Sequence, residues 1–289
     1  MVKNAHLQAL AGRQYNRFSR QQLEDLGFSP KAIECQLAAR RIVRVEEGVF
    51  AMPPVLGDDH GLWMAATLTA PRSFINRLSA ACAWGVLEHR PSFETIVRPG
   101  RGGPKRCGGI VVYRSSVLEG ETTTFDEIPI TTMPRTLLDL ACFVSQNALA
   151  RALRDSVRLR RTTMRELGDH LGLFRGRRGS QRLATAIARY NGLPLVRARS
   201  GAEIRALELL RDSGRPMPRL NVDVAGEEAD LSWPIQKLII EIDGGPYHLD
   251  AGADARKEAV WRGAGWRVER ISSDDVYERP RALLALAPI

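Results

Sequence analysis

A short apolar run near the C-terminus ends abruptly in acidic and turn-forming residues. Residues 238–240 are Leu-Ile-Ile, and they lead directly into Glu241, Asp243 and a pair of glycines. This pattern predicts a buried strand that ends in a turn. Because side chains alternate along a strand, Glu241 and Asp243 are expected on the same side, where two carboxylates repel each other unless a divalent cation lies between them. The segment therefore predicts a metal-dependent hydrolytic site.

The net charge of the chain is concentrated in one stretch. The chain of 289 residues has a formal net charge of +9, and residues 151–199 hold 13 basic and 3 acidic residues. Residues 200–289 are instead acidic, with 12 basic and 16 acidic residues. A basic stretch of this density indicates a polyanionic partner, and we expect double-stranded DNA. A solvated helical face is the alternative explanation.

The composition argues against several classes of protein. A hydrophobic content of 44% is enough for globular cores, and the length predicts two or three domains. No apolar run approaches the ~20 residues of a membrane span, and the N-terminal segment lacks the pattern of a signal peptide. The 4 cysteines have no paired spacing, so they indicate neither a zinc cluster nor a disulfide framework. We therefore expect a cytoplasmic protein without membrane contact.

Residues 1–58 predict a winged helix-turn-helix. Ser19 is placed to cap one helix, Ser29 and Pro30 open a second, and a hairpin with a Glu-Glu-Gly turn follows. Two helices followed by a hairpin are typical of DNA-binding winged helices, in which the second helix faces DNA. The side chains expected to contact DNA here are Lys31, Gln36, Arg40 and Arg41. A protein-interaction module is the alternative function of this segment.

Residues 59–195 predict an α+β middle region that ends in arginine-rich helices. Arg135 and Asp139 lie one helical turn apart, and we expect them to form a structural pair. His170 shows neither metal-ligand spacing nor a partner. The arginines expected to contact DNA in this region are Arg175, Arg177 and Arg178.

Residues 196–289 predict a compact α/β unit with a mixed sheet flanked by helices. The expected elements are helices at 202–211, 255–263 and 279–287 and strands at 221–224, 229–233, 237–243 and 267–271. Together with the preceding regions, this unit predicts an α/β multi-domain fold.

Two stretches of the chain resemble known families. Residues 1–140 resemble the AbiEi family of winged-helix antitoxins and regulators, through Gly48-Val49-Phe50, residues 78–85 and residues 134–140. The C-terminal unit resembles the Vsr-like branch of the PD-(D/E)xK nuclease superfamily, which has a restriction-endonuclease-like fold. The segments behind this second resemblance are Ser200-Gly201-Ala202-Glu203, residues 230–234, Glu241-Ile242-Asp243-Gly244, His248, Asp254-Ala255-Arg256 and residues 265–270.

The nuclease resemblance implies a role for individual residues. The catalytic set that it implies is Asp230, Glu241, Asp243, His248 and Glu203. The first three of these acids would bind Mg²⁺ or Mn²⁺, and the histidine would act as acid or base near the scissile phosphate. Arg256 and Lys257, at the start of the following helix, would neutralise phosphate charge.

One departure from the superfamily pattern affects this interpretation. Many members have a lysine two residues after the second acid, and Asp243 stands there in this chain. A carboxylate cannot supply the positive charge of a lysine, although it can bind or orient a metal. These residues also have alternative, structural roles. Glu203 could complete a helix capping box, and Asp243 could cap the glycine turn through its side chain. His248 could be a surface residue.

Two hypotheses of function follow from the sequence. The first is a DNA-binding protein with a Mg²⁺-dependent endonuclease domain that hydrolyses phosphodiester bonds, in phage defence or toxin–antitoxin regulation. The alternative is a non-catalytic transcriptional regulator or antitoxin that uses a degenerate nuclease fold for binding and has a toxin as its partner. The oligomeric state is left open.

Overall fold

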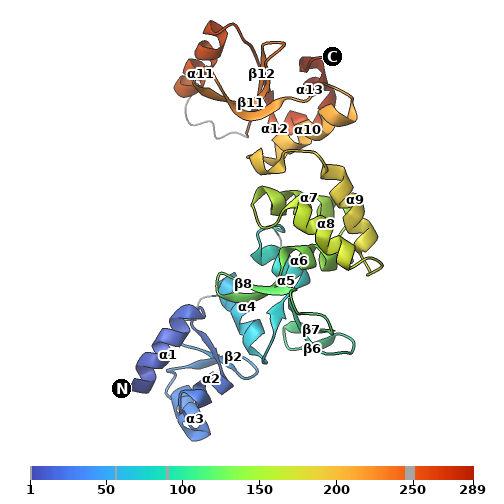
Figure 1. Cartoon of the computed structure of the whole chain (residues 1–289). Coiled ribbons are helices and arrows are strands. Elements are labelled where there is room, and N and C mark those ends of the chain that lie inside the picture. The colour runs from blue at the N-terminus through green and yellow to red at the C-terminus, as the bar shows by residue number, and fades with distance from the viewer. Residues whose placement is uncertain (1, 56, 89–90, 245–250) are drawn as a thin grey trace. The chain divides into compact units, whose positions relative to one another are not determined.

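The protein has an α/β fold with more than one compact unit. The computed structural model describes residues 2–55, 57–88, 91–244 and 251–289. The N-terminal unit comprises Met1–Ser156 with Arg161–Ile187, and the C-terminal unit comprises Val157–Arg160 with Ala188–Ile289. The boundary falls within α9 (Ser180–Tyr190), earlier in the chain than position 195, and the segments 1–58 and 59–156 belong to one unit. Figure 1 shows the elements of both units.

The first part of the N-terminal unit contains two capped helices and a three-stranded antiparallel sheet with the order β1-β3-β2. Its elements are α1 (Val2–Arg13), β1 (Arg17–Ser19), α2 (Arg20–Asp25), α3 (Pro30–Ala38), β2 (Val43–Glu46) and β3 (Val49–Ala51). As predicted, Ser19 caps α2 and Ser29 caps α3, each by accepting a hydrogen bond from a backbone N–H group of the first turn. Helix α1 was not predicted, because its apolar residues do not gather on one face and so produce only a weak periodic signal.

The rest of the N-terminal unit combines a mixed sheet with helices, whereas the sequence predicted helices and strands here without their pairing. The sheet has the strand order β6-β7-β5-β4-β9-β8, with β5 parallel to β7 and β4 parallel to β9. The elements are α4 (Asp59–Leu68), β4 (Phe74–Ile75), α5 (Arg77–Ala83), β5 (Glu94–Pro99), β6 (Lys105–Cys107), β7 (Ile110–Ser115), β8 (Thr122–Phe125), β9 (Ile128–Thr131), α6 (Met133–Leu140), α7 (Gln146–Arg158), α8 (Met164–Leu173) and α9.

A buried charge network connects α6 with α8. Arg135, only 2% exposed, donates hydrogen bonds to Asp139 at 3.0 Å and to Glu121 at 3.4 Å. The Nε2 atom of His170 lies 3.0 Å from a carboxylate oxygen of Glu121. The predicted pairing of Arg135 with Asp139 is confirmed, whereas the expectation that His170 has no partner was wrong. Buried charges persist only when they are paired in this way, so we assign the network a structural role.

The C-terminal unit has a four-stranded mixed sheet with the order β10-β11-β12-β13, in which β12 and β13 are parallel and the other neighbours antiparallel. Its elements are α10 (Gly201–Asp212), β10 (Arg219–Val224), β11 (Glu227–Trp233), β12 (Leu238–Asp243), α11 (Ala251–Gly263), β13 (Arg267–Ser272), α12 (Ser273–Glu278) and α13 (Pro280–Leu286). A mixed sheet flanked by helices is the architecture that the sequence predicted for this unit.

Helices cover both faces of this sheet, and this burial explains the apolar run that precedes the acidic residues. On one face, Ile239 belongs to a buried cluster with Trp261 of α11 and Val268 of β13. Leu238 and Ile240, which alternate with it, are buried too. Figure 1 shows α11 on one side of the sheet and α10, α12 and α13 on the other. A strand buried on both faces is apolar without alternation, and β12 therefore has polar residues only at its end.

Among the residues that the structure describes, no helix combines the length and the apolar character needed to cross a bilayer.

Candidate active site

Asp230 and Glu241 face each other where the hydrogen-bond ladder between β11 and β12 ends. The last paired residues of the ladder are Leu231 and Ile240. Beyond them, the backbone N–H of Asp230 donates to Oε1 of Glu241 at 2.9 Å, and the N–H of Ile242 donates to Oδ2 of Asp230 at 2.9 Å. Two side-chain carboxylates thus take the place of main-chain carbonyls. The predicted hairpin therefore brings these two acids together.

The negative charges of Asp230 and Glu241 are not fully compensated by their surroundings. Burial and, next, the negative charge of Glu241 raise the pKa of Asp230 to about 6. The charge of Glu203 acts in the same direction, and the N–H of Ile242 and the ammonium group of Lys257 act against it. Desolvation and a like charge both disfavour an ionised carboxylate. A perturbed acid beside a second acid is common in functional sites, although structural networks also produce it.

Lys257 supplies positive charge to this pair of acids from α11. Its Nζ atom donates a hydrogen bond to Oε2 of Glu241 at 2.8 Å. The side chain of Glu241 is 9% exposed and that of Lys257 is 26% exposed, so the lysine side chain is still partly open to solvent. A lysine–carboxylate contact with this little solvent is a strong, charge-assisted hydrogen bond.

Asp243 does not join Asp230 and Glu241 in a shared cluster of acids. Arg270 of β13 donates to both carboxylate oxygens of Asp243, with a shortest distance of 2.8 Å. The same guanidinium group lies 3.3 Å from Asp254 of α11. Within the described ranges, no three histidine, cysteine, aspartate or glutamate side chains gather in a way that would hold a metal ion. A metal site formed by Asp230, Glu241 and Asp243 together therefore stays a prediction. In the structure, Asp243 forms an ion pair with Arg270.

Glu203 lies at the N-terminus of α10 and has structural partners. Its backbone N–H donates to the capping hydroxyl of Ser200 at 3.1 Å. Its carboxylate accepts hydrogen bonds from the N–H of Arg199 at 3.0 Å and from Nδ2 of Asn221 at 2.6 Å. Ser200 thus caps the helix as predicted, but the reciprocal bond of a capping box is not formed, because the carboxylate of Glu203 reaches the N–H of Arg199 and not that of Ser200. Glu203 is nevertheless close enough to raise the pKa of Asp230.

The remaining predicted site residues differ in accessibility. His248 lies outside the described residues. Arg256 lies near the middle of α11, which begins at Ala251, earlier than the sequence predicted, and its side chain is exposed. Among the predicted DNA contacts of the N-terminal unit, Gln36 is half-buried, and those with exposed side chains are Lys31, Arg40, Arg41, Arg175 and Arg178.

Arg177 is set apart from the neighbouring arginines by partial burial. Desolvation lowers the pKa of its guanidinium group, and the charge of Arg135 lowers that pKa further. Its guanidinium carbon also lies 5.5 Å from the ring centroid of Phe174. Arg177 therefore faces the interior network more than its neighbours Arg175 and Arg178 do. DNA contact by this region stays a prediction.

Two site features were missed by sequence reasoning. Arg270 had no assigned role, and Lys257 was expected only as a phosphate contact. The pairing of Arg270 with Asp243 depends on the parallel register of β12 and β13, which no local pattern reveals. A local signal existed for Lys257, because Trp261 follows it by four residues and places both on one face of α11.

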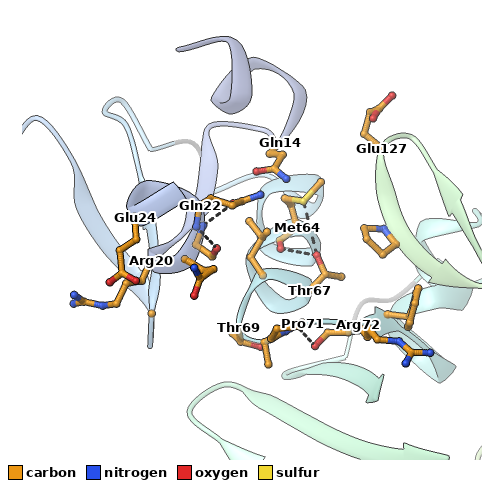
Figure 2. Close-up of a pocket in the computed structure, with 18 residues that line it drawn as sticks. Gln14, Arg20, Gln22, Glu24, Met64, Thr67, Thr69, Pro71, Arg72 and Glu127 are labelled. Atoms are coloured by element: carbon orange, nitrogen blue, oxygen red, sulfur yellow. Dashed lines mark hydrogen bonds between the residues drawn. The ribbon is translucent and has the colours of Figure 1, made fainter. Parts of the chain in front are cut away.

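The N-terminal unit has a separate pocket of about 620 Å³, beside α2 and the C-terminal end of α4 (Figure 2). Thr67 lines it, and its hydroxyl donates to the carbonyl oxygen of Met64 at 2.8 Å. The charged residues of the lining are Arg20, Glu24, Arg72 and Glu127. Because these charges are mixed in sign, the lining favours no single class of ligand.

Comparisons with known proteins give little further information. No known family profile matches this chain, and no curated protein sequence matches it. Among solved structures, the catalytic domain of the homing endonuclease I-Bth0305I is similar to part of the chain, with 22% identity and a TM-score of 0.26. The similarity covers 30% of this chain and 89% of that domain. A likeness with so low a TM-score carries no argument about function.

Proposed function

We propose that this protein binds DNA and that its C-terminal unit is a metal-dependent endonuclease. The observation that supports the proposal most is the pair of facing acids, Asp230 and Glu241, with Lys257 beside them. Buried carboxylates next to a cation are the groups that a phosphodiester-hydrolysing site needs, because metal, water and phosphate must all be held there. The Vsr-like resemblance of the same segment is consistent with this function.

Asp230 and Glu241 are the residues that would hold Mg²⁺ or Mn²⁺. Hard cations prefer carboxylate oxygens, and a cation between these acids would relieve the repulsion that raises the pKa of Asp230 to about 6. Asp243 fits this role less well because Arg270 already pairs with it. The metal would polarise the scissile phosphate and lower the pKa of an attacking water.

DNA binding is proposed for the exposed basic residues. Lys31, Arg40 and Arg41 lie in or just after α3, and Arg175 and Arg178 lie between α8 and α9. Basic side chains that contact phosphates position a protein on DNA without reading sequence. The two capped helices and the hairpin of residues 1–58 are consistent with a winged-helix reader, as in the AbiEi resemblance.

A nicking assay tests the enzymatic proposal. Supercoiled plasmid and a mismatched duplex are incubated with the protein and Mg²⁺ or Mn²⁺. We expect nicking by the parent protein and a loss of about 100-fold or more in Asp230→Asn, which removes an acid at the reacting phosphate. Asp223→Asn is the matched control, because Asp223 is an exposed acid on the neighbouring strand β10. Equal nicking by the parent protein and Asp230→Asn contradicts the proposal.

A second candidate function is favoured by the ion pairs of Arg270. This arginine holds Asp243 and Asp254, as expected if the nuclease-like unit is used for binding alone. The protein would then be a transcriptional regulator or an antitoxin with a toxin partner. It would bind the upstream region of its own gene in preference to random DNA, without cleavage. Mn²⁺ affinity separates the two functions, since only the enzyme binds Mn²⁺ in a way that Glu241→Ala abolishes.

A further inference from the structure

One edge of the six-stranded sheet is basic and contains no acid. Residues 95–118 hold five arginine or lysine side chains and no aspartate or glutamate. These side chains lie on β5, on β7, on the edge strand β6 and in the loop 100–104 that leads into β6 (Figure 1). We call this set the basic edge, and its members are Arg98, Arg101, Lys105, Arg106 and Arg114.

Within the described ranges, no member of the basic edge forms an ion pair, and the hydrogen-bond partners of its side chains are neutral. Arg98 donates to the hydroxyl oxygens of Ser73 and Thr69, each at 2.8 Å. Arg114 donates to the carbonyl oxygen of Pro99 at 3.2 Å. Arginines later in the chain, by contrast, pair with carboxylates in several places. The positive charge of the basic edge is therefore available to a partner.

Two of these cations lie directly opposite each other. Strands β5 and β7 are parallel, and Arg98 is in register with Arg114. Desolvation and, next, the charge of Arg114 lower the pKa of the Arg98 guanidinium group. Like charges at paired positions destabilise a sheet. A solvated surface would explain exposed cations, but a repulsive pair without an acid beside it favours a site that receives an anion.

The exposed part of the basic edge offers charge and few apolar groups. Residues 100–109 are all exposed, and they are glycines, cations, one proline and one cysteine. The half-buried ring of Phe93 is covered by Arg106, whose guanidinium carbon lies 4.8 Å from the ring centroid. Protein interfaces and membrane anchoring both depend on apolar groups, whereas a polyanion requires only cations. The composition of this surface therefore favours a nucleic acid.

The shape of this edge favours DNA over double-stranded RNA. All three residues of β6 are exposed, and the strand pairs with β7 alone. The major groove of B-form DNA admits a two-stranded β-ribbon, whereas the major groove of an RNA helix is too deep and narrow for side chains to read.

We propose that the basic edge is a second contact surface for double-stranded DNA, in which the cations of the loop 100–104 and of β6 contact the phosphates that border one groove. This inference rests on the proposed DNA binding and assigns a contact outside α3 and the segment between α8 and α9. Phosphate contacts position a protein without reading sequence, so this surface contributes affinity and not specificity.

The test removes three charges of the basic edge from the full-length protein. The edge variant carries Arg101→Gln, Lys105→Gln and Arg106→Gln. All three side chains are exposed, so the fold should be retained, and circular dichroism and thermal unfolding check this. A second variant keeps the charge, with Arg101→Lys, Lys105→Arg and Arg106→Lys.

A matched control removes three exposed arginines from the C-terminal unit: Arg219→Gln, Arg267→Gln and Arg281→Gln. It changes the net charge by the same amount as the edge variant. Fluorescence anisotropy with two DNA duplexes of unrelated sequence, at several salt concentrations, measures the affinities and their salt dependence.

If the inference holds, the edge variant binds both duplexes about 10-fold or more weakly, by the same factor for each. The slope of log K against log salt falls by about 2 to 3, because each phosphate contact releases about 0.9 counterion. The charge-preserving variant and the C-terminal control keep the slope of the parent protein.

Four results overturn the inference, and each has a different meaning. If the edge variant keeps the affinity and slope of a parent protein that binds DNA, the basic edge takes no part and the proposed DNA binding stands. An equal fall in slope for the C-terminal control shows an effect of net charge alone. If the edge variant loses binding to an RNA duplex or to phosphatidylserine vesicles but not to DNA, the partner is another polyanion. If the parent protein binds no duplex, the proposed DNA binding fails and this inference fails with it.

Discussion

Three carboxylates of β11 and β12 are compensated in three different ways. Glu241 has the ammonium group of Lys257, and Asp243 has the guanidinium group of Arg270. Asp230 accepts a hydrogen bond from a backbone N–H but, within the part of the chain that the structure describes, forms no ion pair, and its pKa is raised to about 6. Asp230 is therefore the residue at which the folded protein tolerates an unfavourable charge. Such a residue is retained at a cost in stability, which is consistent with a role in binding or catalysis.

The stability of the protein should depend on pH through Asp230. A carboxyl group with a raised pKa binds more protons in the folded than in the unfolded state, so stability falls as the pH rises between about 4 and about 6. In metal-free buffer, the free energy of unfolding of Asp230→Asn relative to the parent protein should increase over this range by at most about 3 kcal/mol. Urea denaturation at several pH values measures it. A flat difference for Asp230→Asn across this range would contradict the raised pKa.

At the scale of elements, the start of α9 packs tightly on α6. Gly179 precedes α9 with a φ of +93°, and a Cβ atom there would lie 2.8 Å from the carbonyl oxygen of Leu138. Gly176, in the same loop, has a φ of +81° and open space around its Cα. Only a glycine allows both the left-handed backbone and the close approach at position 179.

Alanine substitutions at these two glycines distinguish the cost of backbone strain from the cost of steric contact. Gly176→Ala should cost about 1 kcal/mol, because a left-handed alanine is strained in the folded state. Gly179→Ala should cost about 1 to 3 kcal/mol more, since overpacking against the backbone of α6 adds to the same strain. Urea denaturation of both variants measures the difference. Equal losses of stability would mean that α9 is not in contact with α6 through this glycine.

At the scale of the whole molecule, the positive charge is unevenly distributed between segments of the chain. The stretch 151–199 is strongly basic, whereas residues 200–289 are acidic overall. A DNA-binding nuclease with an acidic catalytic unit needs basic residues elsewhere to hold the polyanion. In the proposed function, the exposed cations of the N-terminal unit therefore bind DNA, and the C-terminal unit acts on it.

The salt dependence of DNA binding tests this division of roles. The triple substitution Lys31→Ala, Arg40→Ala and Arg41→Ala should weaken binding and reduce the slope of log K against log salt by about 2 to 3, because each phosphate contact releases about 0.9 counterion. Arg281→Ala, an exposed arginine of α13, is the control and should leave the slope unchanged. Fluorescence anisotropy at several salt concentrations measures the slopes. An unchanged slope in the triple variant would show that these three residues do not contact DNA phosphates.

The sequence by itself determined the features that depend on neighbouring residues. The caps Ser19, Ser29 and Ser200, the hairpin of residues 43–51 and the buried strand before Glu241 were predictable, because local hydrogen bonds and side-chain periodicity specify them. The buried strand placed Glu241 and Asp243 in the last part of β12.

Only the tertiary structure decided which charges meet. The pairs Glu241 with Lys257, Asp243 with Arg270, and Glu121 with His170 each join residues that lie far apart in the chain. Strand register and helix packing set such pairs, and neither leaves a periodic pattern in the sequence. The facing of Asp230 and Glu241 was expected from the hairpin, but the cation beside them had to come from α11. A buried charge is stable only when an opposite charge lies next to it, and only the folded chain brings such partners together.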